Sequence, residues 1–495
     1  MAALRRIAES RPVALLAAAF ADAGHEFALV GGPVRDALLG RPVTDLDFTT
    51  SARPEETQAI LESLTKHIWD VGRDFGTIAA KVAGEGVEIT TYRADSYASD
   101  SRKPAVSFGE TIEGDLVRRD FTINALALML PEMRLVDVAG GVEDLLAGRI
   151  ATPGAPEVSF TDDPLRMLRA ARFASQLGFE VVPETREAMV RFADRLDIVS
   201  AERVRDELVK LLSTADPVPG IRLLVETGLA VRFLPELVAL LETQDDHGRH
   251  KDVYEHSLTV LRQAIELEAA RGRGSEASAA PLVPHTAAAH GAERGVASRE
   301  HDPHPDIVLR LAALLHDIGK PATRRFEGGG VTFHHHDVVG AKLVKKRLRE
   351  LRFDNDTVKR VARLVELHLR FFGYSDQQWS DSAVRRYVRD AGEELERLHI
   401  LTRADVTTRN RRKAERLEHA YDDIERRIAE LAEAEELAAV RPELDGEAIM
   451  ALLGVGPGPL VGRAYRFLLE VRLDEGPIGR DAAEARLRAW FAEQE

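Results

Sequence analysis

The order of apolar and polar residues divides the chain into an N-terminal part of mixed character and a much longer helical part. Before about residue 150, the apolar run 27–30 and the alternating segments 76–82 and 86–93 predict β-strands. An apolar stretch at 13–20 has charged residues close to both ends, which favours an amphipathic helix over a signal peptide. From about residue 155 the spacing is helical. The pattern predicts an α+β fold, with a small mixed sheet and helices in an N-terminal head, followed by all-α regions.

A pair of glycines separates the first predicted strand from a predicted helix. Gly31 and Gly32 allow a sharp turn and a close approach of the backbone to a ligand, and Pro33 suits the first helical position. The N–H groups at such a helix start can hold a phosphate, to which Arg35 can add a charge-assisted hydrogen bond. The segment is therefore a candidate phosphate-binding turn.

Two carboxylates follow this turn about ten residues later. On a strand, Asp45 and Asp47 would share one face while Leu46 points to the other. Carboxylates beside a phosphate-binding turn suggest Mg²⁺ held for phosphoryl or nucleotidyl transfer. Glu88, on the predicted strand 86–93, is a candidate third carboxylate, although a solvated strand residue explains it equally well.

The order GGPVRD…DLDF resembles the active-site signature of the DNA-polymerase-β-like nucleotidyltransferase superfamily, in the form found in its class II tRNA nucleotidyltransferase and bacterial poly(A) polymerase branch. The resemblance implies that Gly31, Gly32 and Arg35 contact the incoming nucleotide. It also implies that Asp45 and Asp47 ligate two Mg²⁺ ions, which activate the RNA 3′-hydroxyl and neutralise the leaving pyrophosphate.

The motif RRDFTINAL at 118–126 places charged residues before an apolar run that we expect to be helical. A charged helix start accounts for the motif without any function. The family resemblance implies instead that it lines the nucleotide site, with four candidate residues: Arg118, Arg119, Asp120 and Asn124. Which arginine reaches the nucleotide stays open, and Asn124 also fits a structural role. The polar segment 94–104 resembles a mobile loop of the same family.

The segment 161–179 predicts a helix with Asp162 or Asp163 as its cap and Pro164 at its first position. Its charged residues recur every third position and form a polar stripe: Asp163, Arg166, Arg169 and Arg172. This stripe fits a solvated basic face. It also matches the EDxxR element of the family, with Asp162 in place of the Glu, which implies that Asp163 and Arg166 read the base.

The chemistry of such a template can be stated. Cytosine and adenine each present an amino donor beside a ring-nitrogen acceptor, whereas uracil and guanine present the opposite pattern. A carboxylate accepts from the amino group and a guanidinium donates to the ring nitrogen. The resemblance further implies that Arg169 and Arg172 lie on the ribose or the phosphates, and that the helix 201–212 supports the template.

Histidines and aspartates of the C-terminal half form a second candidate site. The motif HDIGKP supplies His316 and Asp317, and the whole set resembles the HD metal-dependent phosphohydrolase domain. The resemblance implies six ligands of a divalent metal (Mn, Ni, Fe, Mg or Zn): His256, His316, Asp317, His336, His368 and Asp405. His336 is preferred over His334 and His335 because of its spacing to Gly340-Ala341.

Composition narrows the class of protein. The 495 residues include no Cys, which excludes disulfides and thiolate sites, and no apolar run is long enough to span a bilayer, so we expect a cytoplasmic protein. The net charge of −15 argues against a general polyanion binder, though not against a local basic surface. We expect four regions: a head at 1–155, a helical neck at 156–240, an HD domain at 245–410 with a disordered insertion at about 268–305, and a helical tail at 411–495.

These motifs together predict a template-independent enzyme that builds or repairs the 3′-terminal CCA of tRNA from CTP and ATP. The alternatives are a CC-only or A-only enzyme, a poly(A) polymerase of the same branch, and an HD phosphodiesterase whose N-terminal half only binds nucleotide or RNA. A non-catalytic RNA-binding protein would not need two sets of metal ligands.

Overall fold

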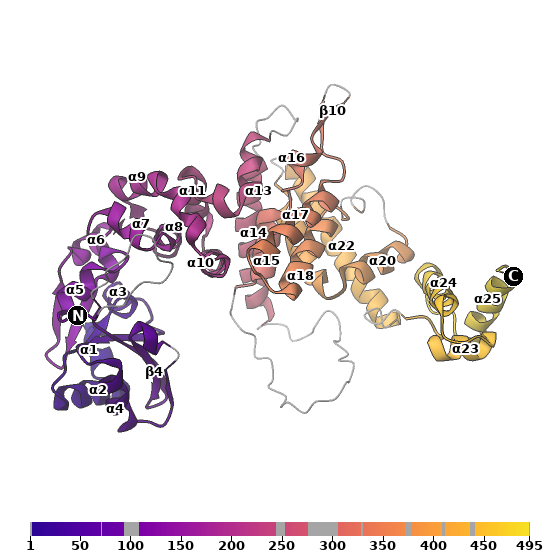
Figure 1. Cartoon of the computed structure of the whole chain (residues 1–495). Helices are drawn as coiled ribbons and strands as arrows, with labels where there is room; N and C mark the ends of the chain where they lie inside the picture. Colours follow the sequence, from indigo (N-terminus) through magenta and orange to yellow (C-terminus); the bar gives the residue numbers. More distant parts are fainter. Residues whose placement is uncertain are drawn as a thin grey trace. The chain divides into compact units, whose positions relative to one another are not determined.

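The computed structural model describes residues 2–70, 72–93, 108–243, 253–275, 305–327, 330–371, 374, 379–407, 411–435 and 441–494. The predicted loop 94–104 lies outside these residues. The chain forms two compact units, Met1–Pro235 and Glu236–Glu495, each described by itself (Figure 1). Among the described helices, none is both long and apolar enough to cross a membrane.

A seven-stranded mixed sheet organises the first unit. Its strands are β1 (Phe27–Val30), β2 (Leu46–Thr50), β3 (Ile68–Trp69), β4 (Thr77–Val82), β5 (Glu85–Thr91), β6 (Leu126–Leu130) and β7 (Arg134–Asp137). Their spatial order is β3-β4-β5-β2-β1-β6-β7, and β2 pairs with β5 in parallel while the other neighbours are antiparallel. The strands predicted at 27–30, 76–82 and 86–93 are confirmed.

The predicted apolar helix after Asp120 is wrong. The chain instead forms a short 3₁₀ turn, η2 (Thr122–Asn124), and then strand β6. All five residues of β6 are buried between β1 and β7. A strand covered on both faces needs no polar alternation, so its apolar run cannot be told from a buried helix by periodicity.

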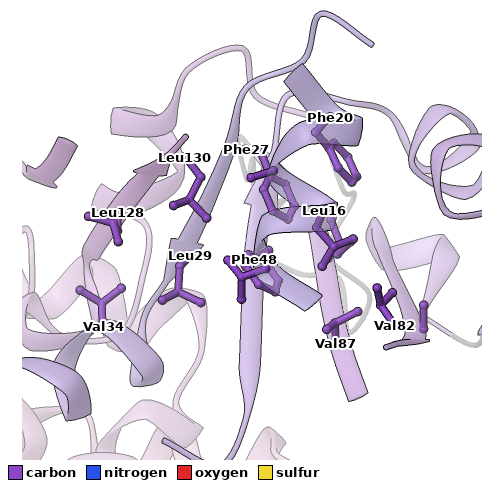
Figure 2. Packing of buried hydrophobic residues seen from close by; sticks show 14 of the residues in the cluster. Leu16, Phe20, Phe27, Leu29, Val34, Phe48, Val82, Val87, Leu128 and Leu130 are labelled. Atoms are coloured by element: carbon purple, nitrogen blue, oxygen red, sulfur yellow. The ribbon is translucent and has the colours of Figure 1, made fainter. Parts of the chain in front are cut away.

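Aromatic rings fill the core on one face of the sheet. Helix α2 (Arg11–Asp22) supplies Phe20, whose ring stacks on Phe27 at 4.4 Å between centroids, and Phe27 stacks on Phe48 at 4.7 Å (Figure 2). The predicted amphipathic helix at 13–20 is thus confirmed as a cover of this face. The other helices around the sheet are α1 (Ala2–Ala8), α3 (Gly32–Leu38), α4 (Pro54–Glu62), α5 (Ile112–Val117) and α6 (Gly141–Ala147).

Helices complete the first unit. They are α7 (Pro156–Asp162), α8 (Leu165–Leu177), α9 (Pro183–Arg191), α10 (Ala201–Leu212), α11 (Val218–Glu226) and α12 (Ala230–Phe233), and a short parallel pair joins β8 (Arg149–Ile150) to β9 (Glu180–Val181). The helix predicted in 161–179, with Asp162 or Asp163 as its cap, is confirmed as α8: Asp163 is extended (φ −141°, ψ 98°), and its carboxylate accepts from the N–H of Leu165. Pro164 favours this extended backbone, since a proline disfavours helical geometry at the residue before it.

In the second unit, the described residues form helices and one hairpin of β10 (Arg325–Glu327) and β11 (Gly330–Thr332). Five helices pack together: α14 (Val253–Ser275), α15 (Ile307–Leu315), α17 (His336–Glu350), α18 (Asn355–Leu367) and α21 (Leu395–Ala404) (Figure 1). The remaining helices are α13 (Pro235–Val238), which spans the boundary, α16 (Lys320–Thr323), α20 (Asp381–Ala391), α22 (Arg411–Glu435), α23 (Gly446–Leu453), α24 (Pro459–Glu475) and α25 (Arg480–Ala492).

The predicted insertion at 268–305 begins too early. Helix α14 continues to Ser275, and Glu268 on it accepts hydrogen bonds from the backbone N–H of Asp306 and from Arg310. Arg271 likewise pairs with Glu425 at 2.8 Å. These polar contacts hold the end of α14. The sequence did not predict this end because the segment has little apolar periodicity. Residues 276–304 lie outside the described residues.

Replacing Phe27 by Ala is expected to destabilise the first unit by about 3–5 kcal/mol, because the change removes a fully buried ring from the middle of a three-ring stack. Hydrogen exchange of the sheet amides measures the opening free energy of this unit. Phe75→Ala is the matched control, since that ring is 53% exposed; equal effects of the two changes would contradict this account of the core.

Candidate active site and metal centre

Three carboxylates gather on one face of the central sheet. Asp47 on β2 is the register partner of Glu88 on β5, and Asp45 immediately precedes β2. Partial burial, followed by the negative charges of Glu88 and Asp45, raises the pKa of Asp47 to about 6. A divalent cation relieves this kind of crowding between like charges. These three carboxylates therefore fit Mg²⁺, and they include Glu88, whose role the sequence left open.

The Gly31 turn joins β1 to α3, and β1 is the neighbour of β2, the strand that carries Asp47. Gly31 has φ of +75°, and its N–H donates to the carbonyl of Leu126. A Cβ at position 31 would lie 3.3 Å from Nη1 of Arg119. The positive φ favours glycine at this position, and the guanidinium of Arg119 lies close to the turn.

The two arginines of the RRD motif differ in position. Both pair with Asp115, Arg118 at 2.8 Å and Arg119 at 3.1 Å. Arg119 also lies beside Gly31. Its positive charge partly offsets the burial and the carboxylates that raise the pKa of Asp47. Arg119 therefore faces both the turn and the carboxylates.

Asp115 was not singled out from the sequence. Burial alone would raise the pKa of its carboxyl, but the charges of Arg119 and Arg118 outweigh burial and lower it. The usable signal was an acid three and four residues before two arginines, a spacing that brings side chains together on a helix. Asp115 thus holds both guanidiniums by ion pairs.

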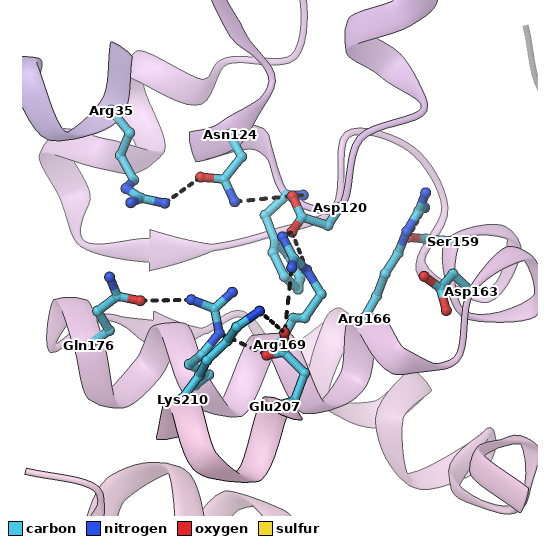
Figure 3. Close-up of polar contacts among 12 residues, drawn as sticks. Arg35, Asp120, Asn124, Ser159, Asp163, Arg166, Arg169, Gln176, Glu207 and Lys210 are labelled. Atoms are coloured by element: carbon cyan, nitrogen blue, oxygen red, sulfur yellow. Dashed lines mark hydrogen bonds and ion pairs between the residues drawn. The ribbon is translucent and has the colours of Figure 1, made fainter. Parts of the chain in front are cut away.

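A chain of polar contacts runs from the head to the helices of the same unit (Figure 3). Arg35 is buried; its guanidinium donates to Asp36 and, at 2.7 Å, to Asn124. The amide of Asn124 donates to Asp120 at 3.0 Å. Arg35 therefore anchors α3 to the RRD motif in this structure, and Asn124 bridges two charged groups.

The chain continues onto α8 and α10. Asp120 accepts two hydrogen bonds from Arg169, at 2.8 and 2.6 Å. Glu207 lies 3.6 Å from Arg169 and 2.8 Å from Arg172. Burial would raise the pKa of Asp120, but Arg169 and Asn124 outweigh burial and lower it to about 2. Arg169 and Arg172 of the polar stripe are thus held in ion pairs within the protein.

The other two members of the stripe lie at the start of α8. Asp163 accepts from the N–H of Leu165 and pairs with Arg203 at 2.8 Å. Arg166 donates to Ser159 Oγ and to the carbonyl of Arg118. Side chains of α7 and α10, together with backbone groups of Leu165 and Arg118, thus orient this pair. Asp163 keeps a quarter of its side chain exposed.

Six residues of the second unit form a compact metal-binding arrangement. Two groups, His256 with His316 and Asp405, and Asp317 with His336 and His368, each bring three potential ligand atoms within 4.8 Å of one another. His316 and Asp317 follow α15, His336 begins α17, and His368 caps α18. His334 and His335 are exposed and belong to neither group.

The imidazoles are oriented for metal binding. Nδ1 of His316, His336 and His368 lies 3.0, 2.8 and 2.7 Å from a backbone carbonyl, which can only accept. Each Nδ1 therefore carries a proton, so Nε2 is the ring nitrogen that a metal would bind. Nε2 of His336 and of His368 is buried without a hydrogen-bond partner, a costly state that a metal ion would relieve. The residues present therefore fit a divalent metal.

Charge and close packing support the same arrangement. Burial, together with nearby His316, lowers the pKa of His368 to about 4 and keeps that ring neutral, as a ligand must be. A Cβ at Gly319 would lie 2.0 Å from the carbonyl of His336. Glycine at 319 thus lets the segment after Asp317 touch α17, which brings the two groups of ligands together.

Replacing Asp120 by Asn is expected to destabilise the first unit by about 2–4 kcal/mol at pH 7, because Arg169 loses its main counter-charge. The pKa of Asp120 is about 2 in the folded chain against an ordinary value of 3.8. Its contribution is therefore complete above pH 4 and is lost as the pH falls towards 2. Calorimetry across this range should show the wild type approaching Asp120→Asn. The control Asp206→Asn, on an exposed side chain of α10, should differ little from wild type at any pH.

Three family models match parts of this chain. Residues 27–151 match the Poly A polymerase head domain, residues 178–241 the probable RNA and SrmB- binding site of polymerase A, and residues 253–410 the HD domain. The A-adding tRNA nucleotidyltransferase of Deinococcus radiodurans is 34% identical over 478 residues, covering 94% of this chain and 96% of that protein.

Two further likenesses extend along nearly the whole chain. The CC-adding tRNA nucleotidyltransferase of Thermus thermophilus is 31% identical, with 93% of each chain covered. The CCA-adding enzyme of Bacillus stearothermophilus, solved in complex with CTP, shares the fold with a TM-score of 0.64 and 24% identity, covering 98% of this chain and 99% of that one. This chain therefore belongs to the class II tRNA nucleotidyltransferase and poly(A) polymerase family, and it is a nucleotidyltransferase with an HD domain.

Proposed function

We propose that this enzyme adds or repairs the 3′-terminal CCA of tRNA, using CTP and ATP and releasing pyrophosphate. The observation that carries the proposal is the cluster of Asp45, Asp47 and Glu88 beside the Gly31 turn. The likeness of nearly the whole chain to two tRNA nucleotidyltransferases supports tRNA as the substrate.

Asp45 and Asp47 would hold two Mg²⁺ ions, and Glu88 would add negative charge next to them. When bound, Mg²⁺ assists ionisation of the attacking 3′-hydroxyl and neutralises charge on the phosphates. Gly31 and Gly32 let the triphosphate approach the backbone, and Arg119 is the arginine of the RRD motif that donates to it. Arg35 contributes to nucleotide binding by fixing α3 through its bonds to Asp36 and Asn124.

Asp163 and Arg166 select the base. The carboxylate accepts from the amino group of C or A and the guanidinium donates to the ring nitrogen, which disfavours U and G. Arg203, Ser159 and the carbonyl of Arg118 restrict the rotamers of this pair before a nucleotide arrives. Arg169 and Arg172, held by Asp120 and Glu207, provide positive charge towards the ribose and phosphates. The head 1–155 would thus supply the chemistry and the neck 156–240 the selection.

A second activity is favoured by the buried histidines of the HD domain. His256, His316, Asp317, His336, His368 and Asp405 hold one or two divalent ions of the Mn, Fe, Ni, Mg or Zn group. A metal at this place would supply Lewis-acid assistance to hydrolysis at phosphorus. The second activity is therefore metal-dependent hydrolysis of a phosphate ester.

Extension of purified tRNAs tests the main proposal. Substrates lack the whole CCA, the final CA or only the final A, and each receives CTP, ATP or both. We expect C, C and A to be added, followed by a stop. Addition of C only or of A only would assign the split specificity of the two relatives, and long A tails on unrelated RNA would assign a poly(A) polymerase.

Replacing Asp45 and Asp47 together by Ala is expected to lower incorporation roughly a thousandfold or more, because the metal-binding carboxylates are removed. Single-turnover extension with radiolabelled CTP measures the loss. Asp74→Ala, an exposed carboxylate of the same unit, is the matched control. Incorporation that survives in the double variant would refute the site assignment.

Replacing His336 by Ala is expected to weaken Mn²⁺ binding by the second unit at least about 100-fold, because a ligand is lost. Isothermal titration of the metal-free protein measures the affinity without any hydrolysis assay. His334→Ala is the control, since this neighbouring histidine is exposed. Equal affinities in the two variants would contradict the ligand set.

A further inference from the structure

Trp69 lies in the same row of the sheet as the catalytic carboxylates. The register runs from Trp69 on β3 to Ala79 on β4, from Ala79 to Glu88 on β5, and from Glu88 to Asp47 on β2. Register partners project to the same face of a sheet. The side chains of Trp69, Glu88 and Asp47 therefore share one face.

Among the described residues, this face is exposed along β4 and β5, whereas over β1 and β6 it is covered by Ile112 and Leu116 of α5. The opposite face is covered throughout β4 and β5. The alternate residues Ile78, Ala80 and Ile89 point into the hydrophobic core. In the carboxylate row, the indole of Trp69 is 51% exposed, and Glu88 is exposed. Ala79 between them is small, so no bulky side chain of the row separates the indole from the carboxylates.

Trp69 is unlike the other two tryptophans of the chain. Trp379 packs edge-on against Tyr374 and Tyr387, and Trp490 stacks on Phe467. Among the described residues, no ring contact or hydrogen bond involves the side chain of Trp69. Half-exposed on a two-residue edge strand, this indole is unexplained by packing, and exposed aromatic rings are the platforms on which proteins stack unpaired bases.

The strand order indicates from which side RNA would reach Trp69. The Gly31 turn and α3 follow β1, on one side of β2, and β5, β4 and β3 lie on the other side. In nucleotidyl transfer, the attacking and leaving oxygens are roughly in line. With the triphosphate at Gly31, the RNA terminus must approach across β5, β4 and β3.

The spacing and charge of this face suit a single strand. Neighbouring strands are about 4.8 Å apart, so Trp69 lies roughly 14 Å from Asp47, a distance spanned by a short stretch of unpaired nucleotides. Lys81 on β4 is exposed on the same face opposite Gly86, and no carboxylate of the described residues pairs with it. A stacking ring and a free cation beside a metal site fit bases and backbone phosphate respectively.

We propose that Trp69 stacks an unpaired base near the 3′ end of the RNA substrate, across the exposed part of this sheet face, with Lys81 beside the backbone. This inference rests on the proposed tRNA-extending function and adds an RNA-binding residue to it. The base of the incoming nucleotide is a different occupant, because Asp163 and Arg166 are proposed to select that base.

Fluorescence tests the stacking directly. In the full chain with Trp379→Phe and Trp490→Phe, Trp69 is the only tryptophan. A tRNA ending in CC, added without nucleotide, should quench its emission in a saturable way, and a blunt RNA duplex should not. Quenching by CTP alone would move the stacked base to the incoming nucleotide, and unchanged emission with the tRNA would overturn the proposal.

Kinetics provide the second readout. Trp69→Ala should raise KM for the tRNA roughly tenfold or more and leave KM for the nucleotide unchanged, and Trp69→Phe should keep most of the affinity. Leu146→Ala, which removes another exposed apolar side chain of this unit, is the control. If the wild type extends tRNA and Trp69→Ala has an unchanged KM, only this inference fails; if the wild type extends no tRNA, the proposed function itself fails.

Discussion

The ion pair between Asp120 and Arg169 is the contact on which the arrangement of the first unit depends. Asp120 precedes β6 of the sheet and Arg169 lies on α8, so the pair joins the part that bears the carboxylates to the part that bears the polar stripe. The pair is extended at one end by Asn124 and Arg35, and at the other by Glu207 and Arg172. A buried charge without these partners would cost several kcal/mol, so its neighbours are constrained as a group.

The two candidate centres bring possible metal ligands together in different ways. In the head, carboxylates collect on an exposed part of a sheet face, where partial burial and their mutual repulsion raise the pKa of Asp47 and favour binding of a cation. In the HD domain, imidazoles are buried and held by backbone carbonyls, so their ligand atoms converge before a metal arrives. An open site admits a large RNA terminus, whereas a buried one restricts access and the coordination number.

Arginines in this protein serve mainly as parts of networks. Arg35 fixes α3, Arg118 and Arg119 share Asp115, and Arg172 is held by Glu207. A guanidinium has five donors in a fixed fork, so it can be positioned by two protein groups and still present N–H groups to a phosphate. An acidic chain can thereby bind polyanionic substrates through a few preorganised cations.

The sequence alone determined the strand–turn–helix at Phe27 to Leu38, the family, and the histidines and aspartates that converge in the second unit, because these depend on local periodicity and on residue types at short spacing. Tertiary structure decided the rest. Strand β6 was mistaken for a helix since burial on both faces removes polar alternation. Strand order and register arise from contacts between residues far apart in the chain. They decide that Arg119 faces Gly31, that Asp115 holds both arginines, and that Trp69 shares a row with Asp47.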